Sequence, residues 1–128
     1  MELKIGTTAT AIAVVGNKNT AKAVGSGDLD VFGTPMMIAL MEEAACNCLK
    51  GFLDATQSSV GTQVNIAHTA ASPVGANITA TAVMISAEGR KVEFSVSARD
   101  EVNEIGNGTH TRVIIDKEKF MSRLTQKM

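Results

Sequence analysis

Alternating hydrophobic and polar residues mark several strands along the chain. The clearest alternation runs through residues 92–99, where four apolar residues take one face and polar residues take the other. A period of two predicts a strand with one buried face and one wet face. Segments rich in Gly, Asn, Asp and Pro separate this strand from its neighbours. The predicted strands are residues 7–15, 60–70, 76–86, 92–99 and 109–115, with a loop over residues 100–108.

A different pattern, without a polar stripe, follows residue 34. Thr34 and Pro35 form a strong helix start, because a Thr hydroxyl can accept from free backbone amides and Pro suits the first helical position. Residues 36–41 are all apolar. We therefore expect a helix over residues 35–49 that lies inside the core. The other expected elements are an irregular loop over residues 25–30 and a short charged helix over residues 117–127.

The order of these elements predicts an α+β fold. One strand and the buried helix are followed by four successive strands, which short turns can join into an antiparallel, twisted sheet wrapped around the central helix. This is the hot-dog arrangement, and residues 1–128 suffice for one such domain with a real core. An open sheet leaves an edge strand and an apolar flank exposed. We therefore expect a homodimer formed edge to edge, or a higher oligomer built from it.

Composition and charge exclude several classes of partner. The chain is 45% hydrophobic and 20% charged with a formal net charge of -1, as is typical of a globular protein. It has neither a basic patch nor Tyr or Trp for stacking bases, which argues against nucleic-acid binding. The start of the chain lacks a secretory signal, and no stretch is long and apolar enough to span a bilayer. We therefore expect a cytoplasmic protein with no nucleic-acid or membrane partner.

The only cysteines, Cys46 and Cys48, are two residues apart. This spacing suits neither a structural disulfide nor a four-ligand zinc site. We interpret both as reduced, buried packing residues. A catalytic cysteine is the alternative, and it would need a nearby base or cation.

Two ionisable residues stand where the pattern predicts core. Glu42 follows the six apolar residues of the helix, where an unpaired carboxylate is costly unless it is protonated, hydrogen-bonded or facing a cavity. Exposure of this helix face, as at Glu43, is the alternative. His68 points with the aliphatic residues of its strand, where a histidine is commonly a satisfied core residue. Together, the acid and the imidazole can share one cavity and perform acid–base chemistry.

The helix start adds a hydroxyl to this pair. Helix capping alone would account for Thr34, but a hydroxyl beside free backbone amides is also where a carbonyl oxygen or an oxyanion can be held. Glu42 lies eight residues further on, about 12 Å along a straight helix. We therefore expect Thr34 and Glu42 to converge only across a subunit boundary or through the substrate.

Three segments of the chain resemble one known family. They are FGTPMMIALME (residues 32–42), VGTQVNIAHTAASPVG (residues 60–75) and EIGNGTHTR (residues 104–112). In unbroken register from about residue 31 almost to the C-terminus, the chain resembles the fluoroacetyl-CoA thioesterase family of hot-dog proteins. The resemblance implies a homodimer with active sites at the subunit interface and hydrolysis of short acyl-CoA thioesters. It also implies no metal and no bound cofactor, with CoA present only as part of the substrate.

The resemblance further implies roles for individual residues. Thr34, Glu42 and His68 match the spacing of the family's catalytic triad. Gly61 would offer a backbone amide near the thioester oxygen, and Arg112 resembles an active-site arginine of the family. For Arg112, a solvated strand-end charge or a phosphate contact to CoA is the alternative.

The stretch before Thr34 departs from the family. The fluoroacetyl-specific member recognises fluorine with aromatic residues ahead of its Thr, and residues 25–30 contain none. Phe32 is the nearest ring and a candidate for substrate binding, but it lies too close to Thr34 to be taken as equivalent. We therefore expect a general short or medium acyl group.

Two other functions fit the same residues. A hydratase or dehydratase acting on acyl thioesters on this fold also uses a His and an acid, but it releases no free CoA thiol. A non-catalytic acyl-CoA-binding module would show saturable binding without turnover.

Overall fold

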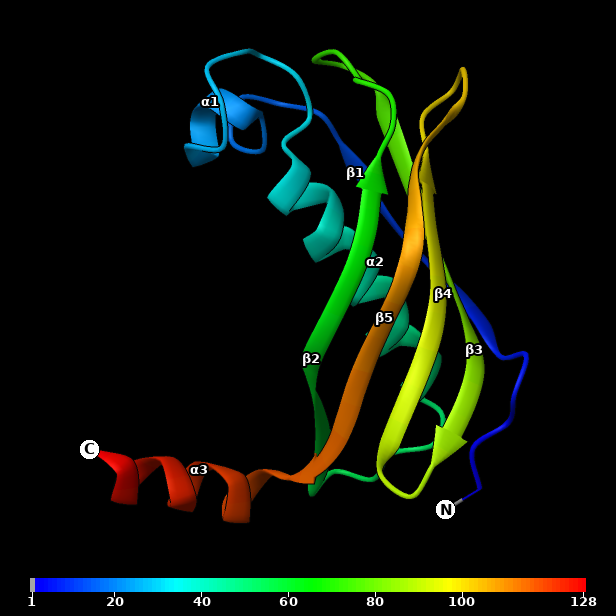
Figure 1. Ribbon diagram of the computed structural model, residues 1–128, viewed down its shortest axis with the longest axis vertical. Helices are drawn as coiled ribbons and strands as arrows, with labels where there is room; N and C mark the ends of the chain where they lie inside the picture. Colours follow the sequence, from blue (N-terminus) through cyan, green and yellow to red (C-terminus); the bar gives the residue numbers. More distant parts are fainter. Residues whose placement is uncertain (1) are drawn as a thin grey trace.

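A curved antiparallel sheet around one helix forms the body of the computed structural model, which describes residues 2–128 (Figure 1). The strand order is β1-β3-β4-β5-β2, and every neighbouring pair is antiparallel. This is the predicted hot-dog arrangement. The strands are β1 (Thr8–Val14), β2 (Gln57–His68), β3 (Asn77–Glu88), β4 (Lys91–Arg99) and β5 (Glu104–Asp116), and the helices are α1 (Ala21–Val24), α2 (Thr34–Leu49) and α3 (Lys117–Lys127).

The start of α2 differs from the expectation in one important detail. Gly33 is the N-cap, Thr34 is the first helical residue, and no side chain caps this end of the helix. The predicted capping role of Thr34 is therefore wrong. Its hydroxyl is available to another partner.

Only one side of α2 is buried. Ala39 is exposed, and Met36 and Ile38 are only partly buried, so the expectation of a helix enclosed on every side is wrong. An apolar flank on the first turns of α2 remains uncovered. The buried residues of the helix, on its other side, are Met37, Leu40, Met41, Ala44, Ala45, Cys48 and Leu49.

β2 is an edge strand, hydrogen-bonded on one side to β5. Along its middle, residues 61–65 and Ala67 are all exposed. A register shift between Gly61 and Gln63 interrupts the expected alternation. Its outer backbone groups have no further strand partner within the described chain, which makes β2 a template for pairing with another strand.

β5 begins at Glu104, earlier than the predicted start at Thr109. The glycines that suggested a loop are needed for close packing inside the strand. A Cβ added at Gly106 would lie 2.6 Å from Cε of Met37 and 2.8 Å from the carbonyl oxygen of Ala67. A residue with a side chain does not fit there.

The two thiols are both free but differ in burial. Cys48 is buried, its Sγ donates to the carbonyl of Ala82 at 3.3 Å, and burial raises the pKa of its thiol. This agrees with a packing residue. Cys46 is partly exposed, so the expectation that both are buried is wrong for this residue.

α3 leaves the end of β5 and points away from the sheet (Figure 1). The carboxylate of Asp116 caps it by accepting from the backbone N–H of Lys119 at 3.0 Å, and none of its residues is buried. None of the helices in residues 2–128 combines the length and the hydrophobicity that a bilayer crossing requires.

Candidate active site

Thr34 and His68 meet where the start of α2 faces the end of β2. Thr34 Oγ1 and His68 Nδ1 are joined by a hydrogen bond of 2.7 Å. Both residues line a pocket of about 280 Å³, together with Phe32 and several small side chains. Phe32 is buried, so its ring forms part of the pocket wall. The remaining lining residues are Ala21, Ser26, Val31, Thr69, Ala70 and Ala71.

The imidazole of His68 has one satisfied nitrogen and one unsatisfied nitrogen. Burial lowers the pKa of His68. A neutral ring can give or take a proton near neutral pH. Nε2 is shielded from solvent and has no hydrogen-bond partner in the described chain. Buried polar atoms rarely stay unpaired, so this nitrogen marks a position for a further group.

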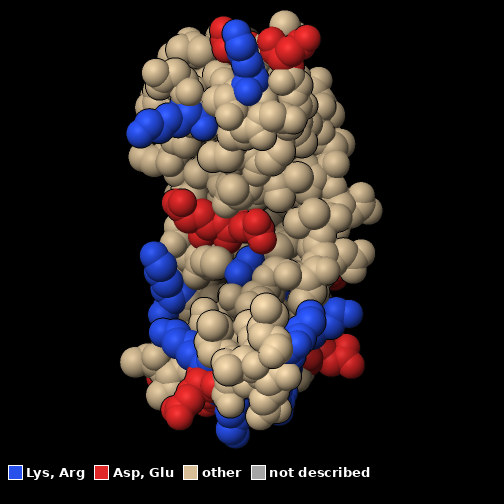
Figure 2. Space-filling model, turned by 90° about the vertical axis from the view of Figure 1, so that its left-hand side faces the viewer, with Lys and Arg blue, Asp and Glu red and all other residues tan. Residues whose placement is uncertain are grey.

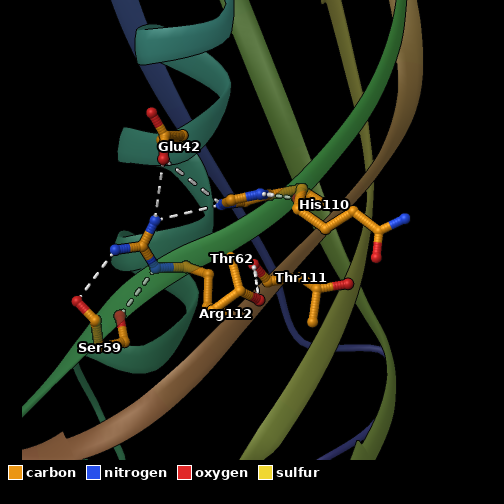
Figure 3. A network of polar contacts seen from close by, with 7 residues as sticks. Glu42, Ser59, Thr62, His110, Thr111 and Arg112 are labelled. Atoms are coloured by element: carbon orange, nitrogen blue, oxygen red, sulfur yellow. Dashed lines mark hydrogen bonds and ion pairs between the residues drawn. The ribbon is translucent and has the colours of Figure 1, made fainter.

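A second polar cluster lies further along α2, around Glu42. We call Glu42, Ser59, His110 and Arg112 the Glu42 cluster (Figure 3). Arg112 is buried, with 7% of its surface exposed. Its Nε donates to Ser59 Oγ at 2.8 Å and its Nη2 to the Ser59 carbonyl at 3.0 Å. Its Nη1 lies 3.4 Å from Glu42 Oε2.

These contacts rule out the solvated strand-end charge considered for Arg112. A guanidinium held by three polar partners from two other elements is a fixed, directional cation. It faces the carboxylate of Glu42, whose side chain is 40% exposed. Arg112 therefore contacts the inner side of this carboxylate, and the outer side is open to solvent. The cluster can hold a carboxylate in one place and present it to a group outside the chain.

Gly61 allows the carboxylate to lie directly on the backbone of β2. A Cβ at this position would lie 2.6 Å from Glu42 Oε2, 3.1 Å from His110 Cε1 and 3.2 Å from Arg112 Nη1. Contacts under 3 Å are not sustained by real side chains. A side chain at residue 61 would therefore have to displace the Glu42 carboxylate.

The chain thus brings the predicted residues together in two groups. Thr34, His68 and Phe32 share one pocket, and Glu42, Gly61 and Arg112 share the other site. The expectation that Glu42 and His68 share one cavity does not hold within a single chain, because Glu42 is not among the residues lining the pocket.

Sequence reasoning missed His110 and Ser59. His110 stands two residues before Arg112 on β5 and pairs with Val64 across the β2–β5 ladder. The period of two places both side chains on the same face of β5, which is the signal that identifies His110. Ser59 carries no comparable signal, because its role depends on the β2–β5 register.

Charged residues are unevenly spread over the face that carries the open side of α2. Figure 2 shows acidic side chains at the middle of this face, and mostly basic side chains with some acidic ones among them toward the end from which α3 projects. Among the described residues, no three His, Cys, Asp or Glu side chains gather closely enough to hold a metal ion.

Comparison with known protein sequences points to one family. Residues 15–118 match the sequence model of the family described as fluoroacetyl-CoA-specific thioesterase. A fluoroacetyl-CoA thioesterase of Streptantibioticus cattleyicolor is 44% identical over 98 residues, which are 77% of this chain and 70% of that protein.

Solved structures agree with this match. A fluoroacetyl-CoA thioesterase superposes with a TM-score of 0.93 at 36% identity, over 100% of this chain and 99% of the other. A mutant of the fluoroacetyl-CoA-specific thioesterase in complex with fluoroacetate and CoA gives a TM-score of 0.86 at 37% identity, over 91% and 98%. A thioesterase superfamily member from Thermus thermophilus gives 0.88 at 27% identity, over 98% and 96%. The similarity extends over the whole hot-dog fold.

Proposed function

The chain belongs to the family of fluoroacetyl-CoA-specific thioesterases, and we propose that it hydrolyses short or medium acyl-CoA thioesters with Thr34, Glu42 and His68 as the reacting residues. Family membership makes it an acyl-CoA thioesterase, and a solved relative carries CoA. The acyl group, the roles of the residues and the way the centre is assembled are the substance of the proposal.

The observation that carries the proposal is the hydrogen bond between Thr34 and His68 beside a pocket. A hydroxyl on an imidazole nitrogen, next to the free amides of a helix start, is an arrangement that can hold a thioester carbonyl and transfer a proton. The unpaired Nε2 of His68 gives the ring a second position at which a reacting group or an acid can bind.

The acid comes, in this proposal, from a second copy of the chain. Each copy holds a Thr34–His68 pair that lacks a carboxylate and a Glu42 cluster whose Ser59 hydroxyl is bound by Arg112. The open edge of β2 and the uncovered flank of α2 are the surfaces on which a second copy can dock. A homodimer with one two-fold axis uses the same surface of both copies.

The β2 edge suggests a register for this homodimer. Because Thr62 is an extra residue at the register shift between Gly61 and Gln63, an antiparallel pairing of two β2 strands about an axis at Asn65 would align His68 with Gly61 of the partner subunit. Since Glu42 lies against Gly61 in each chain, the same register would bring Glu42 of the partner subunit toward His68. Two equivalent centres would result.

The reaction then needs only water as co-substrate. The Thr34 hydroxyl, and the Gly61 amide of the partner subunit, stabilise the thioester oxygen as it becomes negative. The partner's Glu42 activates a water molecule or attacks the carbonyl carbon itself. The C–S bond breaks, the neutral His68 passes the proton that the hydrolytic water loses to the departing thiolate, and the products are a free acid and CoA thiol.

The pocket favours a small acyl group. Its volume is about 280 Å³, and small side chains form most of its lining. Residues 25–30, which lie ahead of Thr34, bring no aromatic ring to it. We therefore propose short or medium acyl groups without a requirement for fluorine. The basic end of the same face suits the phosphates of CoA (Figure 2).

The experiment is a screen of free-thiol release from acetyl-, branched, aromatic and fluoroacetyl-CoA, with His68→Ala as the control. We expect the unmodified protein to release thiol from the acetyl or branched esters. The His68→Ala variant should not reproduce this release. Modification of the acyl chain without thiol release would instead indicate a hydratase. Saturable binding with no turnover of any ester would indicate a binding module, and either result contradicts the proposal.

A further inference from the structure

His110 is the most completely enclosed polar side chain of the Glu42 cluster. It lies on β5 with 1% of its surface exposed. Four groups from four elements face it: the guanidinium of Arg112, the carboxylate of Glu42, the carbonyl of Gln63 and the ring of Phe94, whose centroid is 6.3 Å away. None of the roles assigned to the reacting centre uses this imidazole.

The contacts of the ring determine its tautomer. Nδ1 lies 2.8 Å from the Gln63 carbonyl oxygen, which can only accept, so Nδ1 carries the proton. Nε2 lies 3.1 Å from Nη1 of Arg112, which can only donate, so Nε2 presents its lone pair. Both contacts are satisfied only by the neutral ring with hydrogen on Nδ1 (Figure 3).

This neutral ring is also the one that the surroundings favour. Burial lowers the pKa of His110 and the Arg112 cation lowers it further, while the Gln63 carbonyl and Glu42 raise it. A proton on Nε2 would remove the acceptor and bring two cations together. The contact with Arg112 therefore depends on His110 staying neutral.

Arg112 in turn determines where the Glu42 carboxylate lies. Ser59 holds Nε and Nη2 of the guanidinium, and His110 holds Nη1. The same Nη1 faces Glu42 Oε2 at 3.4 Å. Without the acceptor on His110, Nη1 would keep its carboxylate contact but lose the second of its two partners.

We propose that His110 is a positioning residue for thioester hydrolysis: as a neutral acceptor, it holds Arg112 so that the guanidinium orients the Glu42 carboxylate toward the reacting centre. The inference rests on the proposed function, because it gives Glu42 a direct role in turnover. His110 itself touches neither the substrate nor the reacting atoms.

Two substitutions test the roles of the two ring nitrogens of His110 separately. Asn in His110→Asn can place an amide N–H near the position of Nδ1, but it leaves Arg112 without an acceptor. Gln in His110→Gln can place a carbonyl oxygen near the position of Nε2 and so replace that acceptor. Thr109→Asn is the matched control, because Thr109 is exposed on the opposite face of the same strand.

We expect His110→Asn to lower kcat about 100-fold with KM nearly unchanged, because a carboxylate displaced by about 1 Å loses that much. His110→Gln should recover most of this loss, and Thr109→Asn should behave as the unmodified protein. Melting temperatures identify any variant that loses activity through unfolding. Equal losses in His110→Asn and His110→Gln, in proportion to lost stability, would reduce His110 to a packing residue.

A measurement independent of turnover examines the same claim. The imidazole nitrogen shifts of His110 at neutral pH should report hydrogen on Nδ1 and a bare Nε2, and Arg112→Lys should change the Nε2 shift. Hydrogen on Nε2 would overturn the inference. Glu42→Gln distinguishes failure of the proposed function from failure of the role of His110. If Glu42→Gln abolishes turnover while His110→Asn has no effect, the proposed function stands and the role of His110 fails. Full activity of Glu42→Gln would contradict the proposed function first.

Discussion

The two polar groups along α2 differ in how complete they are. The Thr34–His68 pair has a hydroxyl, an imidazole and a pocket, but one ring nitrogen without a partner. The Glu42 cluster is interlocked by contacts from α2, β2 and β5, and it carries a carboxylate open to the outside. One group lacks an acid, and the other has an acid without a hydroxyl to act on.

This difference fits the proposal that each centre is divided between two copies of the chain. In a shared centre, the Glu42 carboxylate would act on a group held by another chain. A rigid Glu42 cluster fits that role, because the other chain cannot adjust the position of the carboxylate. The looser Thr34–His68 pair must instead admit a substrate.

The largest effect is expected from removing one reacting group on either side. Glu42→Gln and His68→Ala should each lower kcat by about 10²- to 10⁴-fold, because a positioned acid or base contributes that much. Thiol release measures the loss, and circular dichroism should show an unchanged fold. Full activity in both variants would remove these residues from the mechanism.

A smaller loss is expected at the hydroxyl. Thr34→Val keeps the shape but removes the 2.7 Å bond to His68, and kcat should fall about 10²- to 10³-fold if the hydroxyl also stabilises the oxyanion. Thr34→Ser keeps the hydroxyl and is the matched control. If Thr34→Val matched Thr34→Ser in kcat, the hydroxyl would have no role.

Gly61→Ala is expected to act through the Glu42 cluster alone. The new Cβ would lie 2.6 Å from Glu42 Oε2 and displace the carboxylate, so kcat should fall about 100-fold. Gly51→Ala is the control, since an added Cβ there meets nothing within 4 Å. Wild-type kcat in Gly61→Ala, with the protein folded, would mean that the position of Glu42 does not matter.

The smallest effect is expected from pH. Because burial lowers the pKa of His68, its neutral form persists below the pH at which an ordinary histidine, with a pKa of about 6.5, is half protonated. Between pH 7.5 and 6.5, kcat/KM should therefore fall by less than about twofold. It should decline once the pH passes below the lowered pKa. A steep loss already at pH 7 would contradict a buried neutral imidazole.

Much of the fold follows from local patterns in the sequence. The alternation over residues 92–99 gives β4 with Val92, Phe94, Val96 and Ala98 buried, and the apolar run after Thr34 gives α2. The start of β5 was predicted too late, because Gly106 is required by Met37 and not by a turn. A contact between residues far apart in sequence leaves no local pattern.

The candidate site was only partly accessible from the sequence for the same reason. Spacing and resemblance identify Thr34, Glu42 and His68, but not which of them meet in one chain. For Arg112, the alternative of a strand-end charge stayed open because its partner Ser59 is set by the β2–β5 register. The contacts of the Glu42 cluster depend on three elements meeting, and only the structure shows that.

If two copies of the chain share each centre, mixing two inactive variants tests this most directly. Glu42→Gln and His68→Ala are unfolded together, refolded, and assayed for thiol release. If each centre combines His68 of one copy with Glu42 of the other, about half of the dimers are mixed, and one of their two centres is intact. About a quarter of wild-type activity should return. If the mixture stays as inactive as its components while mixed dimers are shown to form, both residues act within one chain and the account is wrong.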